Sequence, residues 1–169
     1  MTPEFSRPAA VERIGAAGRT SEVAADDSEC RALAERFGIL AVESLTARLT
    51  LRAHGPLVHV EGRLSARVVQ ACVVTLEPVA ADIDEAFAIT FGPEVPEDSD
   101  ELVIDLDSED PPEPIIDGKI DLGEVVAEHL ALALDPFPRA PGAVFEPPDA
   151  PGTTGPFAAL AALRKKLPG

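Results

Sequence analysis

Residues 44–69 read SLTARLTLRAHGPLVHVEGRLSARVV, and this stretch decides the fold. Apolar and polar residues alternate through 45–52 and again through 57–68, which is the pattern of two half-buried strands. The AHGP between them, residues 53–56, has the composition of a turn. The sequence therefore predicts a β-hairpin with one apolar face and one polar face.

The polar face of this hairpin carries four arginines, which are Arg48, Arg52, Arg63 and Arg67. Guanidinium groups bind phosphates and carboxylates, so these four side chains are candidate contacts for RNA or for a partner protein. The alternative is that they pair with Glu61 and nearby acids and simply keep the sheet face hydrated. Strand register would decide between these interpretations, and register cannot be derived from the alternation alone.

Further elements are predicted on both sides of the hairpin. Apolar residues at helical spacing indicate a helix over 28–37, and alternation favours a third strand over 79–91. Asp121 as N-cap, with Glu124 three residues later, indicates a capping box that opens a helix over 122–135. We predict an α+β fold in which both helices cover the apolar face of an antiparallel sheet; an open barrel is the alternative.

Composition divides the chain into three parts. We expect one domain over residues 1–138, with an acidic, proline-containing loop at about 92–115. Residues 139–156 are rich in Pro and Gly and predict a linker. Residues 157–167, FAALAALRKKL, predict a short amphipathic C-terminal helix that ends in three cations.

The net charge of −16 is unevenly distributed. Residues 1–78 have a balance of −1, whereas residues 79–169 have a balance of −15. An acidic half repels phosphate backbones and attracts basic proteins. With 46% hydrophobic residues the chain is not a disordered polymer, and it contains neither a membrane-length apolar run nor a secretory leader. We expect a cytoplasmic protein.

The sequence offers little catalytic chemistry. It has no phosphate-binding loop, no dinucleotide fingerprint and no HExxH, and two cysteines, Cys30 and Cys72, are too few for a thiolate metal site. His129 falls on an apolar helical stripe, so we expect a largely buried ring whose nitrogens bond to protein groups. These observations predict no enzymatic activity, no cofactor and no metal. A Cys72 nucleophile paired with His129 is the enzymatic alternative.

Three segments carry a family resemblance: RVVQACVVTLEPV at 67–79, IDLGEVVAEHLALALDPFPRAPGA at 120–143, and PFAALAALRKKL at 156–167. Together they resemble the YceD family, whose members are called large ribosomal RNA subunit accumulation proteins. The pattern is similar to the alphaproteobacterial branch. The resemblance implies a bacterial protein with a role in the accumulation of large-subunit ribosomal RNA, and it implies no known reaction.

The chain departs from the family pattern at its cysteines. Many members carry CxxC where this chain has Cys72 followed by Val, Val and Thr75, and many carry a Cys-rich segment where this chain has residues 139–142. A metal site built on those cysteines cannot be carried over, because one remaining thiolate cannot close a zinc site.

Two functions follow from the sequence. The first is a non-enzymatic ribosome-biogenesis factor that supports synthesis, processing or accumulation of large-subunit ribosomal RNA, in direct or indirect contact with that RNA or an assembly intermediate. The second is an acidic protein-binding module that holds a basic large-subunit ribosomal protein. The two differ in the chemistry of the direct partner.

Overall fold

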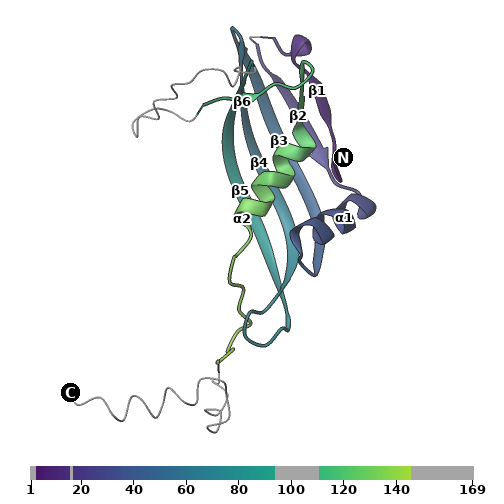
Figure 1. Cartoon of the computed structure of the whole chain (residues 1–169), viewed down its shortest axis with the longest axis vertical. Coiled ribbons are helices and arrows are strands. Elements are labelled where there is room, and N and C mark those ends of the chain that lie inside the picture. The colour runs from purple at the N-terminus through teal and green to yellow at the C-terminus, as the bar shows by residue number, and fades with distance from the viewer. Residues whose placement is uncertain (1–2, 16, 94–110, 146–169) are drawn as a thin grey trace, which may run out of the picture.

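The computed structural model describes residues 3–15, 17–93 and 111–145 (Figure 1). It contains a five-stranded sheet in the order β2-β3-β4-β5-β6 and a two-stranded sheet of β1 and β7. The strands are β1 Pro8–Ala10, β2 Arg19–Ala24, β3 Ala41–His54, β4 Leu57–Ala71, β5 Pro78–Gly92, β6 Glu113–Pro114 and β7 Lys119–Asp121. The helices are the 3-10 helix η1 Val11–Arg13 and the α-helices α1 Asp27–Phe37 and α2 Leu122–Ala133.

The predicted hairpin is confirmed as the centre of the large sheet. Strands β3 and β4 pair antiparallel, with Leu49 opposite Gly62 and Leu51 opposite Val60. Leu49, Leu51 and Val60 have no exposed surface, so the apolar residues of the alternating pattern do face the core. Gly55 occupies the turn at φ +60°, a conformation that favours glycine.

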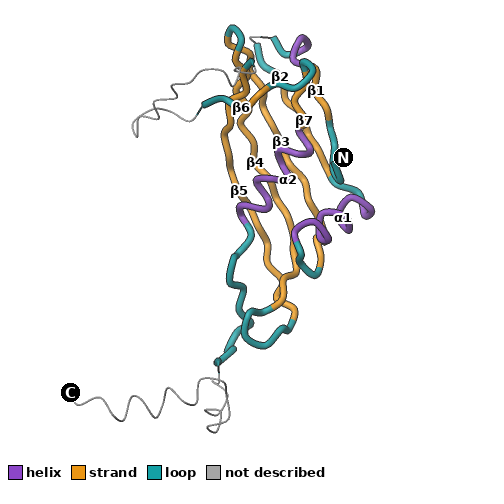
Figure 2. Tube along the Cα trace, viewed as in Figure 1, coloured by secondary structure: helices purple, strands orange, loops and turns teal. Residues whose placement is uncertain are grey.

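Both α-helices lie on one face of the large sheet, as Figure 2 shows. Helix α1 packs against β3, and α2 crosses β4 and β5. The core between helices and sheet is built from fully buried aliphatic side chains, among them Leu33, Leu45, Leu64, Val126 and Leu130. The predicted α+β class, with helices covering the apolar face, is confirmed. The strand order runs from β2 to β6 as an open sheet.

One packing detail corrects the prediction for His129. A Cβ on Gly62 would lie 2.3 Å from the Phe87 ring, so the missing side chain makes room for that ring on the sheet. The His129 ring stacks on Phe87 with 3.9 Å between centroids, and its Nδ1 lies 2.8 Å from the Val125 carbonyl oxygen. His129 is half-buried rather than largely buried, because Phe87 lies between it and the sheet.

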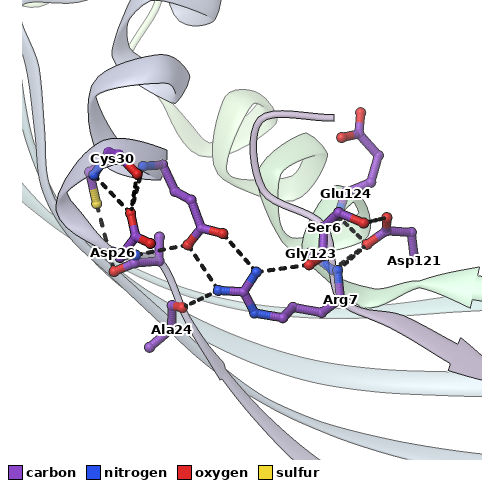
Figure 3. A network of polar contacts seen from close by, with 11 residues as sticks. Ser6, Arg7, Ala24, Asp26, Cys30, Asp121, Gly123 and Glu124 are labelled. Atoms are coloured by element: carbon purple, nitrogen blue, oxygen red, sulfur yellow. Dashed lines mark hydrogen bonds and ion pairs between the residues drawn. The ribbon is translucent and has the colours of Figure 1, made fainter. Parts of the chain in front are cut away.

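The N-terminal segment joins the two α-helices through a polar network (Figure 3). The Arg7 guanidinium donates to both carboxylate oxygens of Glu29 in α1, at 2.7 and 2.8 Å. The backbone N–H of Arg7 donates to Asp121, which caps α2. Phe5, which is fully buried, passes so close to α2 that a Cβ on Gly123 would lie 2.4 Å from the Phe5 carbonyl oxygen. The segment therefore fastens α1 to α2 across the covered side of the sheet.

The helix starts agree only in part with the capping prediction. Asp121 caps α2 by accepting from the N–H groups of Gly123 and Glu124, as predicted. The Glu124 side chain, however, forms two hydrogen bonds with Arg36 of α1 instead of returning to the N-cap backbone, so the predicted capping box is wrong. A complete capping box opens α1 instead, between Asp26 and Glu29.

Several predictions concern residues outside the described ranges. These are the C-terminal helix at 157–167, most of the linker at 139–156 and the central part of the acidic loop at 92–115. At the end of that loop the structure does differ from the prediction, because Glu113–Pro114 pairs in parallel with Phe91 and Gly92 as β6. Neither α-helix in the described part of the chain has the length and apolar run needed to span a bilayer.

Candidate functional site

The four predicted arginines project from the face of the sheet that the helices leave uncovered. They come from two adjacent strands, and their side chains are all about half exposed or more. In the observed register Arg48 lies directly opposite Arg63, and Arg52 lies opposite His59. We call this surface the outer face; it is defined by Arg48, Arg52, Arg63, Arg67 and the acids that pair with them.

Every arginine of the outer face has a carboxylate partner. The ion pairs are Arg48–Glu22, Arg52–Glu61 at 3.6 Å, Arg63–Asp84 at 2.6 Å, and Arg67 with both Glu43 at 2.9 Å and Asp82 at 2.7 Å. Most of these acids come from the neighbouring strands β2 and β5 or from the far end of β3. Arg48 and Arg63 carry like charges and would otherwise repel each other across the strands. The carboxylates of β2 and β5 neutralise them, one on each side of the hairpin.

The electrostatic balance of the outer face is therefore not basic. Four guanidinium groups meet five carboxylates, which leaves these paired groups with a net charge of −1. Arg67 donates hydrogen bonds to Asp82 and to Glu43, and these bonds, that to Asp82 most, raise the pKa of Arg67 above its ordinary value. A phosphate that approaches these arginines competes with carboxylates that already bind them.

A shallow depression is lined by two of the four arginines, Arg48 and Arg63. Its volume is about 520 Å³, and its walls come from β2, β3 and β4. The lining residues with polar side chains are Glu22, Thr46, Arg48, Arg63 and Ser65. Such a surface offers hydrogen-bond donors and acceptors in alternation, which fits a polar protein segment at least as well as a nucleic acid.

A second feature, at the end of the sheet, brings together two segments that are distant in the sequence. The turn after β4 begins at Cys72, whose Sγ accepts N–H groups from Val74 and Thr75, both at 3.4 Å. The backbone N–H of Ala140 also donates to this sulfur, at 3.3 Å. The two places where the chain departs from the cysteine pattern of the family thus lie against each other.

The environment of Cys72 favours its charged form. Hydrogen bonds to the sulfur lower the pKa of the Cys72 thiol to about 6. The backbone N–H group of Ala140 has the largest effect, and the side chain and backbone N–H group of Thr75 come next. Burial and nearby acids instead raise the pKa of Cys30. The sequence does not predict this difference in pKa between the two cysteines, since the contact of Cys72 with Ala140 spans 68 positions.

The described residues do not bring a cluster of potential metal ligands together around these groups. No group of three or more potential metal ligands occurs among them. Cys72 and His129 share no hydrogen bond, since Cys72 accepts from Ala140 whereas His129 bonds within α2. The residues that the sequence pairs as an enzymatic alternative are therefore not brought together as a hydrogen-bonded pair.

The fold and the outer face define an α+β protein with one helix-covered sheet face and one charged, open sheet face. A comparison with family models matches residues 60–164 to the model described as "Large ribosomal RNA subunit accumulation protein YceD". The match covers more than half of the chain, and the chain belongs to the YceD family. No curated protein and no solved structure matches it.

Proposed function

We propose that this protein is a non-enzymatic ribosome-biogenesis factor of the cytoplasm that acts by holding a basic protein of the large ribosomal subunit. Membership of a family named for large-subunit ribosomal RNA accumulation supports the link to that subunit. The balance of −15 in residues 79–169 supports a basic partner, because opposite fields accelerate and orient association. Ribosomal RNA then depends on the protein indirectly.

The observation that carries this proposal is the neutralisation of the outer face. All four candidate arginines are already bound to carboxylates of the same chain. Binding to nucleic acid draws most of its affinity from free cations that neutralise phosphates and release counterions. A face with a small negative balance lacks that driving force.

Direct RNA binding through Arg48, Arg52, Arg63 and Arg67 remains the second candidate, because exposed ion pairs are weak and exchangeable. It makes a quantitative prediction. Four phosphate contacts on single-stranded RNA would give a slope of log K against log salt near about −3, and removing two arginines would halve it. The holding function predicts no such salt-dependent binding of RNA.

The two candidates can be separated with purified full-length protein and a salt series. We would titrate the wild type and the double variant Arg48→Ala with Arg63→Ala, first with large-subunit ribosomal RNA fragments and then with isolated basic large-subunit proteins. The holding function predicts negligible RNA affinity and salt-sensitive binding of at least one basic protein by both variants. Tight RNA binding that the double variant loses would overturn it.

Deletion of the gene tests the link to the large subunit itself. We expect the amount of large-subunit ribosomal RNA to fall relative to small-subunit RNA, and plasmid-borne wild-type protein to restore it. Restoration by the Cys72→Ser variant would support the non-enzymatic interpretation, since it removes the thiol. Unchanged large-subunit RNA in the deletion strain would reject the role in this organism.

A further inference from the structure

A groove on the covered side of the molecule contains none of the residues of the outer face. It lies between α2, the end of β5 and the β6–β7 segment, and its volume is about 430 Å³. Its floor is apolar and consists of Ile89, Phe91, Ile120 and Val125. Ile116, which forms part of the wall, is 57% exposed, although it is a large hydrophobic residue. We call this surface the α2 groove.

The rim of the α2 groove is almost entirely acidic. Its charged residues are Glu113, Asp117, Asp121, Glu124 and Glu128, with Lys119 as the single cation among the described residues that line it. Asp121 and Glu124 are engaged in the helix cap and in the ion pair with Arg36. Glu113, Asp117 and Glu128 form no ion pair with any other described residue.

One carboxyl of the rim, that of Glu128, has a raised pKa. Burial is the main cause, and the nearby charge of Glu124 raises this pKa further, while Arg36 partly opposes the effect. A cation placed in the groove would relieve this repulsion. Among the described residues, the α2 groove therefore combines an apolar floor with a rim that has more acids than cations, in contrast to the outer face, where each arginine is matched by an acid.

We propose that the α2 groove binds a protein segment that combines lysine or arginine side chains with leucine- or isoleucine-like side chains. The apolar side chains would cover Ile116 and the floor, while the cations would meet Glu113, Asp117 and Glu128. The proposal rests on the proposed function and deepens it, because it assigns the basic partner to one surface. A nucleic acid is disfavoured by the acidic rim, and a second copy of this chain would bring a like charge.

The direct test uses the full-length protein and a short fluorescent peptide of leucine and lysine at amphipathic spacing. Peptides with glycine in place of leucine, or with glutamate in place of lysine, serve as probes of the two components. We expect binding of the leucine–lysine peptide to weaken with added salt, at least roughly tenfold weaker binding of the glycine–lysine peptide, and none of the glutamate peptide.

Variants locate the site. Glu113→Gln combined with Glu128→Gln should weaken peptide binding roughly tenfold, and Ile116→Ser should weaken it as well. Glu35→Gln combined with Glu85→Gln is the matched charge control, because both side chains are exposed and lie outside the groove. Leu40→Ser is the matched apolar control, since Leu40 is 54% exposed at the start of β3. All these changes are at exposed positions, so the fold is expected to be retained.

Three results would overturn the proposal. The first is equal weakening by the groove variants and their controls, which would indicate non-specific attraction. The second is binding of the glycine–lysine peptide as tight as that of the leucine–lysine peptide. The third is peptide binding that appears only in the variant Arg164→Gln, Lys165→Gln and Lys166→Gln, because the occupant of the groove would then be the basic segment of the chain itself and not a partner.

The outcome is independent of the proposed function. If the basic large-subunit proteins bind but the groove variants bind them normally, the holding function stands and the α2 groove is not its site. If the peptide binds in the groove but no large-subunit protein does, the groove has the proposed chemistry and the proposed function fails.

Discussion

Arginine–carboxylate pairs occur on both sides of the sheet, but the two sets differ in the elements that they connect and in their exposure. On the covered side, Arg7–Glu29 ties the N-terminal segment to α1, and Arg36–Glu124 ties α1 to α2, with side-chain exposures of 16 to 36%. On the outer face the paired side chains are 48 to 77% exposed and join neighbouring strands that backbone hydrogen bonds already hold. The comparison shows that burial and connectivity, rather than the pair itself, decide its structural value.

Energetic reasoning gives the same distinction. An exposed ion pair contributes roughly 0–1 kcal/mol, since water and salt screen it and two long side chains lose freedom. A partly buried, bidentate pair that joins separate elements is worth more, because its loss leaves charged groups without partners. The ion pairs of the outer face can therefore exchange partners, whereas Arg7–Glu29 and Arg36–Glu124 on the covered side hold elements of the fold together.

The largest effect is expected where the N-terminal segment crosses α2. Replacing Gly123 by Ala would place a Cβ about 2.4 Å from the Phe5 carbonyl oxygen, so the segment or the helix must move. We expect a loss of about 1–3 kcal/mol in the free energy of unfolding, measured by urea denaturation. Gly15→Ala is the control, because nothing lies within 4 Å of a Cβ there. Equal stability of the two variants would contradict the close packing at Gly123.

The next comparison sets one arginine from each side against the other. Arg7→Ala removes the bidentate contact with Glu29 and the bond to the Ala24 carbonyl, so we expect a loss of about 1.5–3 kcal/mol. Arg48→Ala removes only its bonds with Glu22, and we expect a loss below about 1 kcal/mol. Thermal unfolding of both variants under one set of conditions measures the difference. Similar losses would mean that the two sides are not distinct.

Acid should remove the advantage of the covered side. Arg7 lowers the pKa of Glu29 below its ordinary value of 4.5, so the carboxylate stabilises the fold above that pH and loses this contribution as the pH falls through the lower, folded pKa. The difference in unfolding free energy between the wild type and Arg7→Ala should therefore be constant near neutral pH and shrink below 4.5. A gap that is unchanged in acid would show that Arg7 acts through contacts that do not titrate, with the Ala24 carbonyl and the Phe5 ring.

A final effect concerns the Cys72 thiolate, which accepts hydrogen bonds from backbone N–H groups. Backbone N–H groups hold the pKa of Cys72 at about 6, against an ordinary value of 9.0. The thiolate contribution to stability should be complete above pH 9.0 and be lost as the pH falls through about 6. Thiolate absorbance of the Cys30→Ala variant, followed against pH, should show its midpoint near 6; a midpoint near 9.0 would contradict the geometry.

What the sequence predicted well is what depends on neighbours along the chain. Alternation located the β3–β4 hairpin. Helical spacing located α1, and helical spacing together with the N-cap Asp121 located α2, each within two residues. The candidate arginines were placed correctly on one polar face for the same reason. Periodicity determines which way a side chain points, so it needs no knowledge of the rest of the fold.

What the sequence could not predict depends on register and on long-range contact. The acids that bind Arg48 and Arg63 come from β2 and β5, and only the observed register places them there. Glu124 does not complete the predicted capping box, because its carboxylate accepts hydrogen bonds from Arg36 of α1. The contact of Cys72 with Ala140 and the α2 groove likewise require segments far apart in the chain. A polar pattern therefore identified the arginines, but it could not show that they are neutralised.

We propose that this protein meets the assembling large subunit through protein contact on its covered side, not through RNA on its outer face. The most direct measurement places a photo-crosslinking amino acid at Ile116 in the α2 groove or at Thr46 on the outer face, in cells that are making ribosomes. We expect a discrete adduct with a basic large-subunit protein from position 116 and no ribosomal RNA adduct from position 46. Ribosomal RNA crosslinked from position 46, with no protein adduct from position 116, would contradict it.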